Sequence, residues 1–302
     1  MRVAILSRKR SLYTTRRIIE ECKDQNIEPV VLNPLKCDII VGKDNHNLYY
    51  NKKKQKKVDA VIPRFGFSIT HYGNSILRRF ADMGVPSVAS PDAIAIARDK
   101  FHSLQVLSQA GIKVPATIMV RNPANISKAI DRVGGVPVII KLIRGTQGVG
   151  VIILESKQAA ESTVDALWRL GRHMLIQQYI IESRGTDVRV IVVDGEVVAG
   201  YKRIARHGEF RSNIHKGSVG EPIDLSYEHK EMAKKSAYVL NLGVAGVDII
   251  ESVKGLMVLE VNASPGIEGI EKATRINVGR RIVEYAKKLA SKSGGFDTET
   301  GK

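Results

Sequence analysis

Cysteine and aromatic residues are scarce in this 302-residue chain, and long apolar runs are missing altogether. Its two cysteines, Cys22 and Cys37, lack the spacing of metal ligands, so we expect a reducing, cytoplasmic setting. No apolar run approaches the roughly 18–20 residues of a membrane span. The N-terminal stretch is also too short for a signal peptide and resembles an opening strand. We therefore expect no role in a membrane.

Histidine and aromatic residues exclude two further classes of site. The seven histidines form no H-x-H or H-E-x-x-H pattern, so the sequence gives no indication of a zinc site. Aromatic residues make up 5% of the chain and do not interleave with its densest basic run, Lys52–Lys57. A stacking platform for single-stranded RNA is therefore not expected.

Positive charge is in excess. Forty-seven Lys and Arg residues against 31 Asp and Glu residues give a net charge of +16, which implies attraction to a polyanion. Nucleic acid, the ribosome, phosphates and an acidic peptide all remain open as partners. We interpret Lys52–Lys57 itself as the solvated edge of a hairpin or loop.

Strand-like and helix-like segments alternate over residues 1–92, and this rhythm predicts a small α/β unit with a largely parallel sheet. Strands are expected at Val3–Leu6, Pro29–Leu32, Val58–Ile62 and Val85–Ala89, and helices at Leu12–Cys22 and Ile76–Met83. Ser90 and Pro91 then predict the start of a helix over Ala93–Gln109, which ends at Gly111.

Three further parts are expected after this unit. Residues 93–172 form a central unit with a glycine-rich loop, and residues 173–290 form a strand-rich unit. Helices at Glu228–Leu240 and Gly279–Ala290 are expected to pack around this third unit. Residues 291–302 are small and polar, and we expect a frayed tail.

A hairpin near the C-terminus carries the first candidate site. Two short apolar strands flank a turn at Val253–Gly255, and Asp248 and Glu260 are equidistant from its centre. The two carboxylates should therefore face each other, with Asn262 on the same side of the sheet. Such a pair is destabilising unless a cation lies between them, and oxygen ligands suit Mg²⁺. A solvated hairpin with its acidic face outward is the alternative.

The segment Gly145–Gly150 is the second candidate. It fits neither a P-loop nor a dinucleotide-binding loop, because strand residues follow it instead of a helix. The remaining mechanism is a flap whose backbone N–H groups close over phosphate oxygens, with Lys141 on the strand that enters it. An ordinary glycine-rich turn beside a solvated lysine is the alternative.

Arginines concentrate just before the hairpin, at Arg203, Arg206 and Arg211. Solvated surface arginines are the default interpretation. Their closeness in sequence to the candidate Mg²⁺ site favours a clamp for phosphate and carboxylate groups.

Together these segments resemble the ATP-grasp superfamily, and specifically the RimK-type alpha-L-glutamate ligases, which modify ribosomal protein S-six. The resemblance covers nearly the whole chain. It is carried by Val3–Ser7, Asp59–Arg64, Ala97–Lys100, Lys141 with Gly145–Gly148, Phe210–Asn213, Val244–Asp248 and Glu260–Gly266. It implies an ATP-grasp fold, α/β overall and α+β in its catalytic part, after a Rossmann-like pre-ATP-grasp domain.

The resemblance also implies a role for each matching position. Lys100, Lys141 and the loop residues Gly145, Thr146, Gln147 and Gly148 would hold ATP phosphates. Gln178, Tyr179 and Ile180 would bind adenine through backbone groups, and Asp187 would hydrogen-bond the ribose. Arg211, Ser212 and Asn213 would line the phosphate and acyl site, with Arg203 as a further clamp; Arg203, Arg211 and Asn213 are the expected catalytic residues. Asp248, Glu260 and Asn262 would hold Mg²⁺, with two ions expected and Mn²⁺ as a substitute. One departure is Gln178, where the family commonly has Glu.

The implied reaction adds L-glutamate to a C-terminal carboxylate through an acylphosphate, with release of ADP and phosphate. The implied acceptor is the acidic tail of a ribosomal protein, and no direct contact with nucleic acid is required. Two alternatives remain: an amino-acid ligase of the same fold that acts on a small metabolite or cofactor, and a basic ribosome- or nucleic-acid-binding protein. The sequence is compatible with a homo-oligomer but does not determine the oligomeric state.

Overall fold

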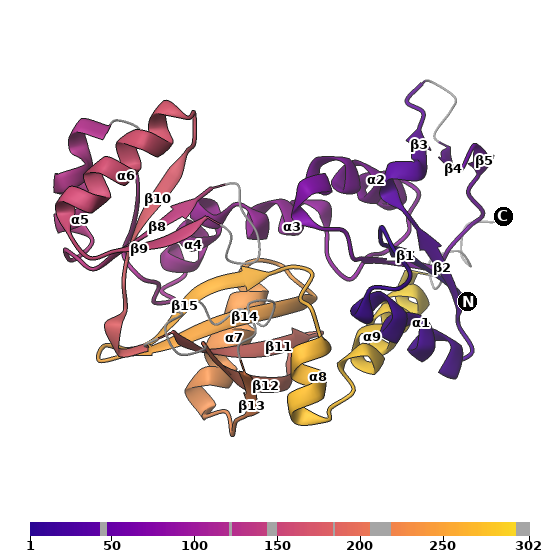
Figure 1. The fold of residues 1–302 in the computed structure, drawn as a ribbon. Coiled ribbons are helices and arrows are strands. Elements are labelled where there is room, and N and C mark those ends of the chain that lie inside the picture. Colours follow the sequence, from indigo (N-terminus) through magenta and orange to yellow (C-terminus); the bar gives the residue numbers. More distant parts are fainter. Residues whose placement is uncertain (43–46, 121–122, 144–149, 184, 206–218, 294–302) are drawn as a thin grey trace.

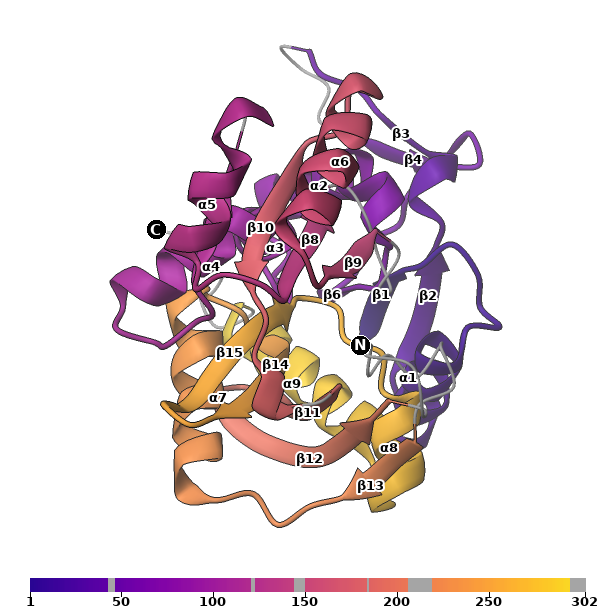
Figure 2. The same cartoon turned by 60° about the vertical axis from the view of Figure 1, so that its left-hand side comes forward.

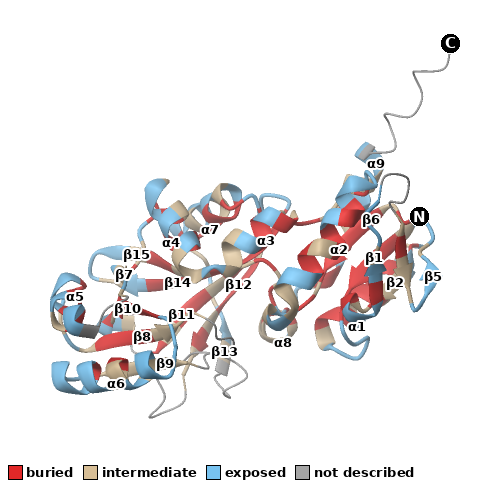
Figure 3. Cartoon of the chain, turned by 90° about the horizontal axis from the view of Figure 1, so that it is seen from above, coloured by how far each residue is buried: buried red, intermediate tan, exposed pale blue. Residues whose placement is uncertain are grey.

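The computed structural model describes residues 1–42, 47–120, 123–143, 150–183, 185–205 and 219–293. Its strands form four sheets, and the small sheet β3-β4-β5 is inserted in the chain between two strands of the first, β2 and β6 (Figure 1). In this part of the chain, no helix combines the length and the apolar character that crossing a membrane requires. Buried residues concentrate on the strands, whereas most residues of the outer helix α6 are exposed (Figure 3).

The N-terminal unit is built on a parallel three-stranded sheet in the order β2-β1-β6. Its elements are β1 (Arg2–Leu6), α1 (Tyr13–Asp24), β2 (Glu28–Leu32), β6 (Ala60–Pro63) and α2 (Thr70–Asp82). The expected strand at Val85–Ala89 is wrong, because Ser87 only forms an isolated bridge to Val61. Pro86 lacks the N–H that a longer ladder would need.

A small antiparallel sheet projects from this unit. It contains β3 (Cys37–Ile39), β4 (Leu48–Tyr50) and β5 (Lys53–Lys54), after a short 3-10 turn at Pro34–Lys36. Both lysines of β5 are exposed. The basic run therefore lies at a solvated hairpin edge, as predicted.

The long helix expected over Ala93–Gln109 is two helices, α3 (Pro91–Arg98) and α4 (Lys100–Gln109). The chain turns at Asp99, whose φ of −82° and ψ of 101° are extended. The Asp99 carboxylate accepts hydrogen bonds from the backbone N–H groups of Phe101 and His102, so it caps α4. This break redirects the chain immediately before Lys100.

The central unit is a four-stranded antiparallel sheet in the order β7-β10-β8-β9. Its strands are β7 (Thr117–Met119), β8 (Val138–Leu142), β9 (Val151–Leu154) and β10 (Met174–Gln178). Helices α5 (Ile126–Arg132) and α6 (Lys157–Arg169) share a core with one face of this sheet. The boundary predicted from the sequence, at 172/173, precedes β10. The strand instead pairs between β7 and β8, so the central unit continues to Gln178.

The C-terminal unit is a five-stranded antiparallel sheet in the order β13-β12-β11-β14-β15. Its elements are β11 (Thr186–Val193), β12 (Glu196–Ile204), β13 (Val219–Pro222), α7 (Tyr227–Val239), β14 (Val244–Ser252), β15 (Gly255–Asn262), α8 (Glu268–Thr274) and α9 (Val278–Ser293). Helix α7 covers one face through Val188, Val190 and Val192 (Figure 2). Part of the opposite face, at Ile191 and Val193, packs in one core with α8 and α9.

Helix α9 packs on the third unit as expected, through contacts with β11 and β12. It also lies against α1 and β6, and its residues Val278, Ile282 and Val283 share a core with Val3 and Ile5 (Figure 1). The helix therefore ties the N-terminal and C-terminal units together. It continues to Ser293, three residues into the expected tail, and residues 294–302 lie outside the described part.

Candidate active site

A row of polar side chains crosses the C-terminal sheet on the face opposite α7. The strand register places Tyr201, Arg189, Asp248 and Glu260 side by side on four consecutive strands. Directly paired residues point to the same face, and residues two positions apart share it. Asp187, Arg203 and Asn262 therefore belong to the same face. The apolar part of this face is covered by α8 and α9, which leaves the polar row as the candidate site.

Asp248 is the centre of this row and is held by two arginines. Arg189 donates to both its carboxylate oxygens at 2.6 Å, and the guanidinium of Arg203 lies 2.9 Å from one of them. Burial would raise the pKa of Asp248, but Arg189 and Arg203 outweigh burial and hold the pKa at about 2. Asp248 is therefore a fixed, ionised carboxylate.

Arg203 is also engaged on its other side. It donates from Nε and Nη2 to the two oxygens of Asp187, at 2.6 and 2.7 Å, and both side chains are 3% exposed. Burial would lower the pKa of Arg203, yet Asp248 and Asp187 raise it well above its usual range. The structure therefore places Arg203 in a buried ion-pair chain, where it positions Asp248, rather than in an open clamp. Asp187, expected at the ribose, is likewise committed to this chain.

The facing of Asp248 and Glu260 is confirmed, although the hairpin reaches it differently from our prediction. The two-residue turn pairs Ser252 with Gly255, and this register alone would place Leu259 opposite Asp248. A bulge between the pairs Asp248–Glu260 and Ile249–Val258 shifts the strand by one residue. Without the bulge, Glu260 would point to the other face.

Glu260 is the open member of the pair. Its side chain is 41% exposed, and Asn262 donates to Oε1 at 3.2 Å, while Arg189 lies 4.0 Å away. The described residues contain no cluster of three or more His, Cys, Asp or Glu side chains suited to a metal. A site here would therefore use both carboxylates and the Asn262 amide oxygen, a donor set that fits Mg²⁺.

Two lysines reach this site from other parts of the chain. Lys141 lies on β8, on the face away from α5 and α6, and Lys100 opens α4 and donates to the backbone oxygen of Leu142 at 3.2 Å. Burial lowers the pKa of Lys141 to about 8, Glu260 and Asp248 oppose this shift, and Lys100 adds to it. Burial also lowers the pKa of Lys100 against the opposing effect of Glu260. The start of α4, strand β8 and the β14–β15 hairpin therefore bring two lysines close to two carboxylates.

The lowered pKa of Lys141 predicts a proton linkage. Nucleotide phosphates would restore the charge of this amine, so ATP binding should take up a proton near pH 8, and ATP affinity should fall as the pH rises above about 8. In the free protein, the charged amine destabilises the fold below about pH 8. That cost disappears as the pH rises toward 10.5, the ordinary value.

Calorimetry of ATP binding in two buffers of different ionisation enthalpy measures this uptake. Lys141→Met should abolish the uptake and weaken binding, whereas Lys128→Met, an exposed lysine on α5, should leave both unchanged. An equal proton uptake in the Lys141 variant would contradict the assignment.

The expected adenine segment lies at the end of β10. Gln178 ends the strand, and its backbone N–H donates to the carbonyl of Ala116 at 2.8 Å, while Ile180 is buried beside Ile250 and Met257. Gln177, which the sequence did not single out, points to the same face as Lys141. Its side chain is 1% exposed and its Oε1 has no hydrogen-bond partner among the described residues. Its only signal in the sequence is that it precedes Gln178 on an expected strand, where adjacent side chains point to opposite faces.

Several predicted residues lie outside the described part of the chain: Gly145, Thr146, Gln147, Gly148, Arg206, Arg211, Ser212 and Asn213. Their roles remain predictions. In contrast, Arg189 was missed although it contacts Asp248 directly. The sequence does indicate that Arg189 shares a strand face with Asp187, because the two are two residues apart. Only the order of the strands shows that Arg189 contacts Asp248.

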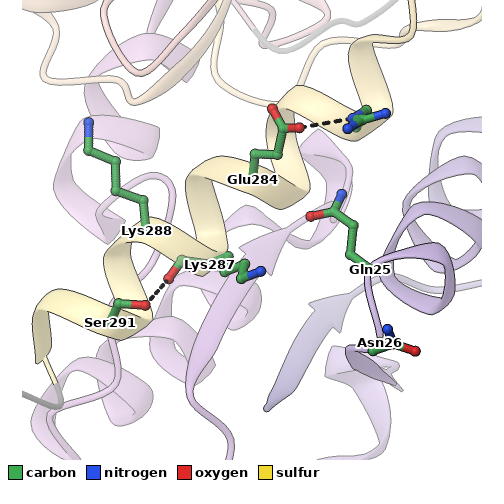
Figure 4. A pocket seen from close by; sticks show the side chains of 7 residues that line it. Gln25, Asn26, Glu284, Lys287, Lys288 and Ser291 are labelled. Carbon is green, nitrogen blue, oxygen red and sulfur yellow. Dashed lines mark hydrogen bonds and ion pairs between the residues drawn. The ribbon is translucent and has the colours of Figure 1, made fainter.

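Two hollows lie away from these residues. A hollow of about 530 Å³ is lined by Gln25, Asn26 and five residues of α9 (Figure 4). A larger one, about 1180 Å³, lies beside α7 and includes Met232, His229 and Glu251. None of the candidate site residues lines either hollow.

Comparison with known proteins agrees with this geometry. The RimK-like ATP-grasp domain matches residues 97–286, and the RimK pre-ATP-grasp domain matches residues 1–94. The chain belongs to the RimK-like ATP-grasp family. It is therefore an ATP-grasp ligase with a pre-ATP-grasp domain, and the predicted fold class is confirmed.

Curated relatives of this ATP-grasp ligase match along almost their whole length. It is 44% identical over 290 residues to a probable alpha-L-glutamate ligase of Thioalkalivibrio sulfidiphilus (strain HL-EbGR7), with 96% of each chain covered. It is 42% identical over 300 residues to the ribosomal protein bS6–L-glutamate ligase of Shigella boydii serotype 4 (strain Sb227), with 98% of this chain and 100% of the relative covered. The ATP-grasp ligase PsnB, solved with a minimal precursor, Mg and ADP, has a TM-score of 0.74 at 20% identity, with 96% and 98% covered. This last similarity shows the fold.

Proposed function

We propose that this ATP-grasp ligase adds L-glutamate to the C-terminal carboxylate of an acidic polypeptide. The reaction would use ATP, pass through an acylphosphate and release ADP and phosphate. The observation that carries the proposal is the convergence of Lys100 and Lys141 on the carboxylates of Asp248 and Glu260. Cations suited to phosphates and oxygen ligands suited to a divalent ion are therefore close enough to affect one another's charge.

The nucleotide would lie between the central sheet and the polar row. Lys141 and Lys100 would bind phosphate oxygens, and the backbone of Gln178–Ile180 would bind adenine. Asp248, Glu260 and Asn262 would hold Mg²⁺, whose chemistry is to neutralise phosphoryl oxygens; a second ion, or Mn²⁺ in its place, is part of the proposal. Arg189 and Arg203 keep Asp248 ionised and oriented for this role.

The first step forms a bond between the acceptor carboxylate oxygen and the γ-phosphorus of ATP and breaks the bond to ADP. The protein supplies position and positive charge rather than a nucleophile. Charge on the transferring group increases the attraction of Lys141, which lies in a site from which water is largely removed.

In the second step, the neutral amine of L-glutamate attacks the acyl carbon, phosphate leaves and the amine gives up a proton. The expected flap residues Gly145–Gly148 would exclude water that otherwise hydrolyses the acylphosphate. Arg211 and Asn213 would contact the acyl and phosphate groups, as the family resemblance implies.

The acidic acceptor is favoured by charge and by the names of relatives. A net charge of +16 attracts a polyanionic tail and retains it as glutamates are added. One relative is named as a ligase of glutamate to ribosomal protein bS6, which favours a ribosomal protein as the acceptor.

Incubation with ATP, Mg²⁺, L-glutamate and a peptide that ends in acidic residues tests the proposal by mass spectrometry. The expected product is the peptide extended by whole glutamyl units, and the number of glutamyl units added should equal the number of ADP molecules formed. A matched peptide with an amidated C-terminus is the control and should not react. Extension of a small metabolite alone would favour the second ligase hypothesis, and polyanion binding without ADP formation would favour a binding protein.

A further inference from the structure

Two arginines beside the candidate site have no acidic partner. Arg64 follows β6 and Arg98 ends α3, and no carboxylate of the described residues forms an ion pair with either. Arg64 Nε is buried and has no hydrogen-bond partner among those residues. Arg189 and Arg203, by contrast, are matched with Asp248 and Asp187. Because an unpaired buried cation is costly, it is expected where a ligand supplies the missing anion.

Arg98 is held firmly in place. It donates to the backbone oxygens of Phe65 and Gly66 at 2.5 and 3.3 Å and to Thr70 Oγ1 at 2.6 Å. Its guanidinium carbon also lies 4.8 Å from the centre of the Phe65 ring. These contacts place a permanent cation next to Arg64 without neutralising it.

The pKa values agree with this geometry. Burial lowers the pKa of Arg64 to about 10, and Arg98 lowers it further in the same direction. Burial alone lowers the pKa of Arg98 to about 10. No carboxylate opposes either shift.

Both arginines adjoin segments of the candidate active site. The Arg64 backbone N–H donates to the carbonyl of Leu6, at the carboxyl end of the central strand β1. The carbonyl of the preceding residue, Pro63, accepts a hydrogen bond from Ser264 Oγ at 3.1 Å. Ser264 lies two residues beyond Asn262. Arg98 lies two residues before Lys100. The two arginines therefore lie on chain segments next to those that carry Asn262 and Lys100.

We infer that Arg64, supported by Arg98, binds a substrate carboxylate that does not itself react. The inference rests on the proposed function, in which both L-glutamate and an acidic acceptor bring such carboxylates. Arg64 would donate to the carboxylate, and Arg98 would add positive charge and fix the segment 65–70. The site would be a second anion-binding position, separate from the lysines that face the phosphates.

The test compares Arg64→Met and Arg64→Lys with the wild-type enzyme. In Arg64→Met, the KM for one carboxylate substrate should rise about 10- to 100-fold, as expected for a lost charge-assisted hydrogen bond, while the KM for ATP stays unchanged. Arg64→Lys should recover part of this loss. The melting temperature should stay level or rise, because an unpaired and partly buried cation has been removed. Arg78→Met, an exposed arginine on α2 that pairs with Asp92, is the matched control.

Substrate analogues identify the carboxylate. If Arg64 binds L-glutamate, the wild-type preference for glutamate over glutamine should shrink in Arg64→Met. If it binds the acceptor, the preference for a penultimate Glu over Gln in the peptide should shrink instead. Unchanged KM values for both substrates in Arg64→Met would overturn the subsite while leaving the ligase activity intact. Absence of glutamyl transfer by the wild-type enzyme would overturn the proposed function, and this inference with it.

Discussion

Glu260→Gln should lower the rate of glutamyl transfer by about 10²–10³-fold or more while leaving the fold intact. Glu260 is the open carboxylate of the site, and its charge acts on both Lys100 and Lys141. The amide keeps the size of the side chain but removes the negative charge that Mg²⁺ requires. Because the side chain is 41% exposed, its replacement removes little packing. Steady-state ADP formation and thermal unfolding measure the two effects.

Glu251→Gln is the control on the same hairpin. Glu251 is an exposed residue of β14 near the turn, with His229 as its neighbour at 3.7 Å. Its turnover and melting temperature should match the wild-type values. Wild-type turnover in Glu260→Gln would contradict the metal assignment, even if Glu251→Gln behaved as expected.

Arg203→Met should lower the free energy of unfolding by about 3–5 kcal/mol, because it breaks a buried ion pair by removing one partner. Asp187 and Asp248, 3% and 2% exposed, both lose a guanidinium contact. The lowered pKa of Asp248 stabilises the fold above its ordinary value of 3.8, and this contribution is lost as the pH falls toward about 2. In the variant the pKa of Asp248 should rise, so acid unfolding should begin at a higher pH.

Denaturant unfolding at neutral and acidic pH measures both changes. Lys202→Met, on the same strand but the other face, is the control and should change stability little. An Arg203 variant as stable as this control would show that the ion-pair chain does not support the site.

Local patterns predicted the parts of the site that depend on one hairpin or one strand. The facing of Asp248 and Glu260 could be predicted because it depends on the alternation of strand side chains and on the position of the turn, and both can be identified within one short segment. The prediction still missed the bulge at Leu259: the turn lies half a residue earlier than expected, and the two differences cancel at this pair. Lys141 was found because a charge at the end of a β-branched strand is conspicuous.

Features that depend on distant pairing could not be predicted in this way. Arg189 meets Asp248 only because β11 lies beside β14, and the segment of Arg64 lies next to that of Asn262 only because Pro63 contacts Ser264. The transfer of β10 to the central sheet likewise depends on pairing with β7 and β8. The break before Lys100 did have a local signal, since Asp99 is a favoured helix N-cap.

The most direct test of the account follows oxygen from the acceptor carboxylate. A peptide labelled with oxygen-18 at its C-terminal carboxylate is incubated with ATP, Mg²⁺ and L-glutamate, and the released phosphate is analysed by mass spectrometry. With both oxygens of that carboxylate labelled, activation by phosphoryl transfer predicts one singly labelled phosphate for each extended peptide, because later additions activate the unlabelled carboxylate of the glutamate just added. Extended peptide formed without any labelled phosphate would contradict the proposal that this site phosphorylates the acceptor.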